Sequence, residues 1–105
     1  MATHHWVYVQ DTGDSTREPT ILRSSGRIVV NREGGLTNFG KYIVTFPSTM
    51  AVDACVGSLA NSVGFITVIP GISGALRPNQ VRVLTMNPDN SAGARSFCLA
   101  AFSNA

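Results

Sequence analysis

The stretch GKYIVTFP, residues 40–47, decides the fold class of this chain. Its side chains Tyr42, Val44 and Phe46 recur at every second position, which is the period of a β-strand with one buried face. The stretch ends at Pro47, which has no N–H to donate to a neighbouring strand. We therefore predict a core strand here, and none of its residues suggests chemistry.

The rest of the chain repeats this short-strand pattern with almost no helical periodicity. Runs of β-branched and aromatic residues alternate with clusters of Gly, Pro, Asn, Asp and Ser, as in all-β sandwiches. Segment 51–60 also suits a helix, but neighbouring strands and Gly57 favour a strand. We predict one domain, residues 1–105, folded as an antiparallel β-sandwich of about eight strands, a jelly roll. The expected strands are 5–10, 20–24, 26–32, 40–47, 51–60, 64–70, 79–86 and 94–102.

Two of these strands carry more detailed expectations. Residues 64–70 have apolar side chains on both faces, so we expect this strand to be packed on both sides. In residues 79–86, Val81 and Val83 are expected to face inward and Arg82 outward.

Composition limits the class of protein. The chain of 105 residues is 44% hydrophobic and only 13% charged, whereas roughly 25% charged residues is typical of soluble domains. So little charge favours a surface that is partly covered by partners, most simply by copies of the same chain. The net charge is +2 with scattered basic residues, and nucleic acid is not expected because phosphate binding needs a concentrated basic surface.

The N-terminus, MATHHW, has no basic and then apolar signal sequence. No apolar run approaches the roughly 18 residues of a membrane span. We expect a soluble chain without an export signal and without membrane insertion.

Two cysteines, Cys55 and Cys98, lie far apart in strand-like segments. Zinc is not expected, because only His4 and His5 could join them as ligands, and adjacent residues of an extended segment point to opposite sides. No metal and no cofactor is predicted. Two interpretations of the cysteines remain open: two small buried side chains, or a disulfide that implies an oxidising compartment or a virion.

Asn87, Asp89 and Asn90 are the candidate ligand-binding residues. Amide and carboxylate groups crowded into one tight loop suit hydrogen bonds to sugar hydroxyls. The same residue types are also the usual formers of turns. A carbohydrate ligand and a purely structural turn are both consistent with this sequence.

Two further groups have a functional and a plainer interpretation. A calcium loop is one interpretation of Asp11, Asp14 and Glu18, but they lack its dense alternation of oxygen ligands, so capping of a solvated turn is favoured. The aromatic residues suit stacking on sugars or bases, or burial in a core or oligomer contact. These aromatic residues are Trp6, Tyr8, Phe39 and Phe102.

Three arginines, Arg27, Arg32 and Arg82, are expected to project from the outer side of their strands. In an oligomer they are candidates for pairs with Asp53 or Glu33 of another subunit, and the plainer interpretation is a solvated face.

An enzyme is not expected. The serines have no histidine placed to act as a base, and no G-x-S-x-G turn is present. These serines are Ser24, Ser25, Ser58 and Ser96.

A series of loose motifs follows one another along the chain. They are Trp6 in the first strand, Gly26 before a Val-rich strand, Gly-x-Tyr-x-Val-x-Phe at 40–46, Cys-x-x-x-Leu-Ala at 55–60, Gln-Val-x-Val-x-Thr at 80–85 and Phe-x-Leu at 97–99. In this order they resemble a β-sandwich module found in bacterial secreted proteins and phage tail or fibre proteins. In outline the chain is similar to the trimeric jelly rolls of the C1q and tumour-necrosis-factor type. The resemblance implies a jelly roll that often trimerises and binds something outside the cell, and it supplies no catalytic residues.

We therefore expect a non-catalytic module that forms a symmetric oligomer, a trimer by the resemblance. Its expected role is a binding or capping domain of an extracellular or phage fibre structure, with a cell-surface glycan as candidate partner. The alternative is a structural subunit that assembles into a fibre, tube or shell without a ligand. Either role places the chain outside the cell or in a virion.

Overall fold

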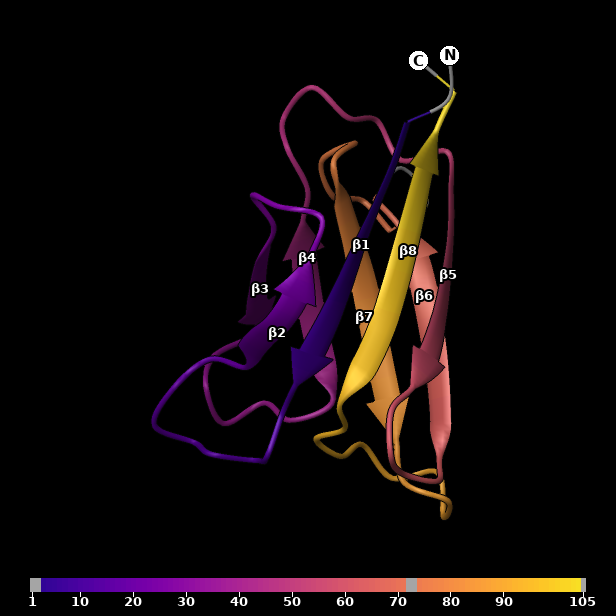
Figure 1. Cartoon of the computed structure of the whole chain (residues 1–105). Helices are drawn as coiled ribbons and strands as arrows, with labels where there is room; N and C mark the ends of the chain where they lie inside the picture. Colours follow the sequence, from indigo (N-terminus) through magenta and orange to yellow (C-terminus); the bar gives the residue numbers. More distant parts are fainter. Residues whose placement is uncertain (1–2, 72–73, 105) are drawn as a thin grey trace.

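Two antiparallel sheets of four strands stack face to face in the computed structural model, which describes residues 3–71 and 74–104 (Figure 1). The strand orders are β2-β1-β8-β5 and β3-β4-β7-β6. The predicted all-β, eight-stranded antiparallel sandwich is confirmed, whereas a jelly-roll connectivity is not confirmed by this strand order. The strands are β1 (Thr3–Gln10), β2 (Thr20–Ser24), β3 (Val29–Arg32), β4 (Lys41–Thr45), β5 (Ala54–Leu59), β6 (Phe65–Pro70), β7 (Gln80–Met86) and β8 (Phe97–Ser103).

Segment 51–60, for which a helix was the competing interpretation, contains strand β5. None of the described residues belongs to a helix long and apolar enough to cross a membrane.

A single core fills the space between the sheets. Tyr42 and Val44 of β4 are fully buried, together with Phe46 just beyond the strand, as the alternation in residues 40–47 predicted. The rings of Tyr42 and Phe97 pack across the sandwich with centroids 5.1 Å apart and planes at 52°, a tilted arrangement that aromatic pairs favour. The other large side chains that are fully buried are Val7, Val9, Val52, Val81, Val83, Thr85 and Leu99.

Strand β6 is an edge strand of its sheet, which corrects the expectation that both its faces are packed. Among the described strands it pairs only with β7, and Phe65 remains 52% exposed. Only its inner side, with Ile66 and Val68, contacts the core. These two side chains approach Gly57 of β5 so closely that a Cβ there would lie 2.9 Å from Val68 and 3.2 Å from Ile66. Gly57 thus allows the two edge strands, β5 and β6, to pack closely against each other along this side of the sandwich.

A buried ion pair joins the two sheets. Arg32, at the end of β3, donates from Nη2 to Oδ1 of Asp11 at 2.6 Å and from Nε to Oδ2 at 3.3 Å. The hydroxyl of Tyr42 donates to Oδ2 of Asp11 at 2.6 Å. Both charged side chains are only 1% exposed. The expectation that Arg32 projects outward was wrong, because Arg32 shares the inner face of β3 with buried Val30.

The same arginine organises the two neighbouring loops. Its Nη1 donates to the carbonyl oxygens of Asp14, Arg17 and Leu36, and the Phe39 ring lies 4.8 Å from its guanidinium carbon, within the range of cation–π contacts. Phe39 is therefore a partner of Arg32 and no part of an aromatic binding surface.

The acidic residues of the first loop have three different roles. Asp11 is buried in the ion pair, which corrects its interpretation as a solvated cap. Asp14 caps the turn by accepting from the Thr16 N–H and hydroxyl, and Glu18 accepts from the backbone N–H of Arg32 at 2.8 Å. In the described part of the chain, no three His, Cys, Asp or Glu side chains lie together as a metal site would need.

The protonation states of this cluster follow from its contacts. Burial alone raises the pKa of Asp11, but hydrogen bonds from Arg32, Tyr42 and the Gly13 N–H outweigh burial and hold that pKa below its ordinary value. Burial and the neighbouring Asp11 carboxylate raise the pKa of Tyr42. At neutral pH Asp11 is therefore ionised and Tyr42 is a neutral donor.

Two arginine-to-methionine variants test the importance of this ion pair. Arg32→Met leaves the Asp11 carboxylate buried without a cation, which typically costs about 3–5 kcal/mol of unfolding free energy. Arg82→Met is the matched control, because Arg82 binds Glu33 through two bonds of 2.7 and 2.8 Å with both side chains partly in solvent. Its loss is expected to be much smaller. Urea unfolding measures the unfolding free energy of both variants. Equal losses of stability would contradict the importance of the buried ion pair.

Candidate functional site

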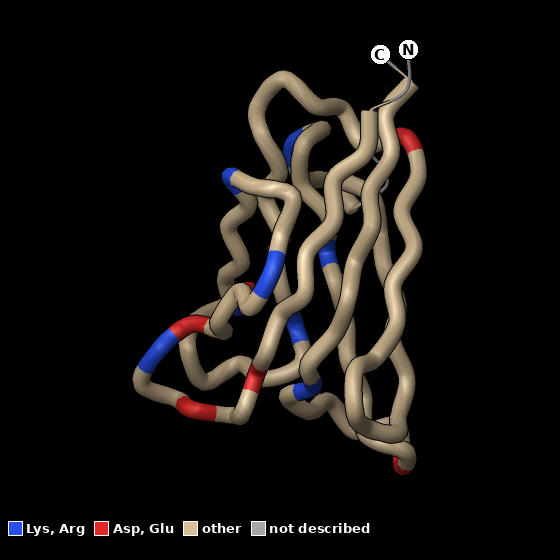
Figure 2. The backbone as a smooth tube through the Cα atoms, in the orientation of Figure 1, with Lys and Arg blue, Asp and Glu red and all other residues tan. Residues whose placement is uncertain are grey.

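The outer side of the sheet β2-β1-β8-β5 is the main apolar surface of the described protein, and we call it the open face. Trp6 of β1 is 43% exposed on it, Val56 of β5 is 61% exposed and Phe102 of β8 is 42% exposed. Strands β1, β8 and β5 contain no Lys, Arg, Asp or Glu, as Figure 2 shows. Arg23 of β2 adds a charged side chain at the border of the open face.

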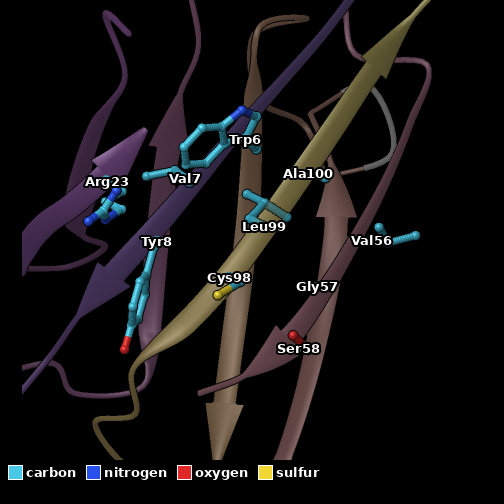
Figure 3. A pocket seen from close by; sticks show the side chains of 10 residues that line it. All are labelled: Trp6, Val7, Tyr8, Arg23, Val56, Gly57, Ser58, Cys98, Leu99 and Ala100. Atoms are coloured by element: carbon cyan, nitrogen blue, oxygen red, sulfur yellow. The ribbon is translucent and has the colours of Figure 1, made fainter. Parts of the chain in front are cut away.

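Cross-strand pairing creates a groove along the open face. Ala100 of β8 lies between Trp6 on one side and Val56 on the other. Cys98 likewise lies between Tyr8 and Ser58 in the next row. Because the β8 side chains in these rows are small and their neighbours on β1 are large aromatics, a shallow groove of about 470 Å³ follows β8 (Figure 3).

The outer side of the other sheet is covered more fully. Arg82 of β7 forms its ion pair with Glu33 there and donates from Nη1 to the carbonyl oxygen of Gly74 at 2.9 Å. The pair lies within one chain, whereas a pair between subunits and a solvated face were the two interpretations of Arg82. The hydrogen bond from Arg82 also holds Gly74 against this sheet. The open face is therefore the sheet surface with the least polar cover.

The two cysteines are free. Cys55 faces the core and is half-buried, whereas Cys98 is exposed on the open face. Their strands are neighbours, but the two side chains point to opposite sides of the sheet, so they cannot approach in disulfide geometry. The disulfide interpretation is thus corrected, and the alternative of two buried side chains fits Cys55 alone. Burial raises the pKa of the Cys55 thiol.

Thiol labelling tests this placement of the cysteines. With a maleimide at neutral pH, Cys98 is expected to react first, because the thiolate is the nucleophile and Cys55 is both shielded and less acidic. Cys98→Ser should remove the fast phase, and Cys55→Ser should leave it intact. Mass spectrometry after limited labelling measures the difference, and two equal rates would contradict the structure.

The predicted ligand residues form a closed turn between β7 and β8. Oδ1 of Asn87 accepts from Nε of Arg95 at 3.1 Å, and its Nδ2 donates to Ser91 Oγ at 3.0 Å. Asp89 accepts from the N–H and the hydroxyl of Ser91, and Asn90 has a φ of 69°. These side chains serve the turn itself, and ligand binding by them stays a prediction.

Among the remaining candidates, His5 and Ser25 lie together, which corrects the expectation that no histidine is placed beside one of the serines. His4 points to the open face, with its ring 6.4 Å from that of Phe102, while Nδ1 of His5 lies 2.9 Å from Ser25 Oγ. Asp53 accepts from the backbone N–H of Asn104 at 2.7 Å. Arg27 is exposed.

Of the four aromatic residues proposed as a stacking surface, Trp6, Tyr8 and Phe102 share the open face and Phe39 does not. Alternation along β1 and β8 could have predicted this grouping. The groove between them could not be predicted, since it depends on which residues pair across strands.

No protein-family model matches the chain, and neither a curated protein nor a solved structure matches it.

Proposed function

We propose that this chain is a non-catalytic β-sandwich module that forms a symmetric homo-oligomer through its open face. The exposure of Trp6, Val56 and Phe102 on a sheet whose three adjoining strands carry no charge is the observation that supports it. Exposed apolar surfaces of this kind are typical of protein contacts. Covering them is favourable by about 25 cal/mol for each Å² of apolar area.

The dimensions of the open face set the expected strength of association. Strand β1 has eight residues, and strands rise about 3.3 Å per residue and lie about 4.8 Å apart, so the face measures roughly 26 by 15–19 Å. This projected area of roughly 400–500 Å² is smaller than the ~800 Å² per partner of a standard interface. We therefore expect association that weakens on dilution.

A second copy of the chain is the partner that suits this face best. A surface whose central strands carry no charged side chains cannot select a partner by charge complementarity. Symmetric assemblies of identical chains are also the commonest oligomers. Three copies that turn their open faces toward a three-fold axis would bring these apolar surfaces together. A trimer also agrees with the resemblance to trimeric jelly rolls, on which the role as a binding or capping domain of an extracellular or phage structure depends.

Two valine-to-lysine variants test the oligomer. Val56→Lys places a charge in the open face and is expected to give a monomer. Val29→Lys is the matched control, because Val29 is 53% exposed on the outer side of the other sheet, and it should keep the wild-type mass. Size-exclusion chromatography with light scattering at tens of micromolar should give a wild-type mass near three times 11.1 kDa. A monomeric wild type, or equal effects of both variants, would contradict the proposal.

A structural subunit that polymerises is the second candidate. Val63 and Phe65, 74% and 52% exposed, form apolar surface apart from the open face. Contacts between two unlike surfaces generate open fibres unless they close into a ring. Negative-stain electron microscopy of the same sample separates the two candidates, because closed small particles support the module and fibres or tubes support the subunit.

A further inference from the structure

A second depression, of about 230 Å³, lies beside the open face where β1 ends and β8 begins, and we call it the polar hollow. Its side chains come from three separate segments: the end of β1, the turn after β5 and the segment before β8. The polar side chains that line it include Tyr8, Gln10, Asn61, Ser62 and Arg95. Tyr8 also lines the apolar groove, so the two depressions are neighbours.

Hydrogen bonds from backbone N–H groups fix the walls of the polar hollow. The N–H of Ala60 donates to the Ser96 carbonyl at 2.9 Å, and the Asp11 N–H donates to Ser96 Oγ at 3.1 Å. The Arg95 N–H donates to the Tyr42 hydroxyl at 3.4 Å. The hollow is therefore tied to the buried ion pair and is formed before a ligand arrives, which lowers the entropic cost of binding.

Several polar groups that line the hollow have no hydrogen-bond partner among the described residues and are available to a ligand. Among the described residues, the side chains of Gln10 and Ser62 make no hydrogen bond. Asn61 donates a single long bond of 3.5 Å to the Tyr8 hydroxyl, which leaves its carbonyl oxygen free. Amide and hydroxyl groups that converge on one depression are the usual means of orienting a small ligand.

Arg95, one of the residues that line the hollow, has a positive charge with which no carboxylate of the described residues forms an ion pair. Nε and Nη2 of Arg95 donate to Asn87 Oδ1, a neutral amide, and within the described chain Arg95 forms no ion pair. Hydrogen bonds from Ser91, and to a smaller extent the charge of Arg95, lower the pKa of Asp89, but the side chains of Asp89 and Arg95 form no ion pair. Asp11, the carboxylate in the wall, is already neutralised by Arg32. An anionic ligand would supply the missing countercharge.

We propose that the polar hollow binds a carboxylate-bearing sugar. The Arg95 guanidinium would take the carboxylate in a charge-assisted hydrogen bond, the Gln10 and Asn61 amides would take ring hydroxyls, and the Tyr8 ring would offer an apolar surface to the sugar. The depression is smaller than the ~300–1,000 Å³ of sites for drug-sized ligands, which suits a single sugar unit. Asn87 is then a positioning residue, because it holds Arg95 and does not contact the ligand.

The polar hollow is formed by residues of one chain and shares Tyr8 with the open face, so sugar binding does not require self-association. A monomeric Val56→Lys variant should therefore bind the sugar as the wild type does, so a failure of one proposal leaves the other testable.

Titration of ¹⁵N-labelled protein with sodium glucuronate, followed by NMR, tests the site. Saturable shifts are expected at Asn61, Ser62 and Arg95, with weaker binding of glucose and of acetate. Arg95→Gln should weaken glucuronate binding about tenfold or more, as for a lost hydrogen bond to a charged group. Gln10→Ala should also weaken glucuronate binding and leave the fold unchanged. Arg23→Gln, on the open face, is the matched control and should bind as the wild type does.

Three results would overturn the proposal. They are the absence of saturable shifts with glucuronate, equal affinity for glucose or acetate, and equal affinity of the Arg95→Gln and Arg23→Gln variants.

Discussion

The buried ion pair between Asp11 and Arg32 is the constraint on which the other features of this protein depend. It joins the end of β1 in one sheet to the end of β3 in the other, and Tyr42 completes it from the central strand β4. A buried ion pair is seldom more stable than a well-packed apolar substitute, and we infer that this one serves mainly to specify a single arrangement of the two sheets. Arg32 fixes both adjoining loops through three carbonyl oxygens. Asp11 in turn anchors the segment before β8 through Ser96, and thereby shapes the polar hollow.

The alternation of apolar and polar side chains predicted the strands and, for most of them, which side faces the core, because successive side chains of a half-buried strand point to opposite sides. Val81 and Val83 lie inside, as expected. The same rule would have placed Arg32 inside, two residues after buried Val30, but a charged residue was assumed to face solvent. Its partner Asp11 could not be predicted, because nothing local marks a contact across 21 positions. An apolar run such as β6 likewise does not reveal whether its strand is central or at an edge.

The functional surfaces differ in how far a sequence can predict them. Trp6 and Tyr8 follow from alternation along β1, and so does Phe102 along β8. The groove needs the cross-strand neighbours of Ala100, and the polar hollow needs three segments to meet. The opposite orientations of Cys55 and Cys98 also depend on register, since Cys55 pairs with Ala101 and not with Cys98. Long-range pairing therefore decides both the candidate sites and the state of the thiols.

The open face contains the single tryptophan of the chain, Trp6, so its fluorescence reports directly on whether this face is the subunit contact. In the proposed oligomer the indole is covered, and its emission should lie at shorter wavelength and resist acrylamide quenching. Dilution through the association range should shift the emission to longer wavelength and increase quenching, in step with the fall in mass. Emission and quenching that stay constant while the mass falls would show that subunits associate through another surface.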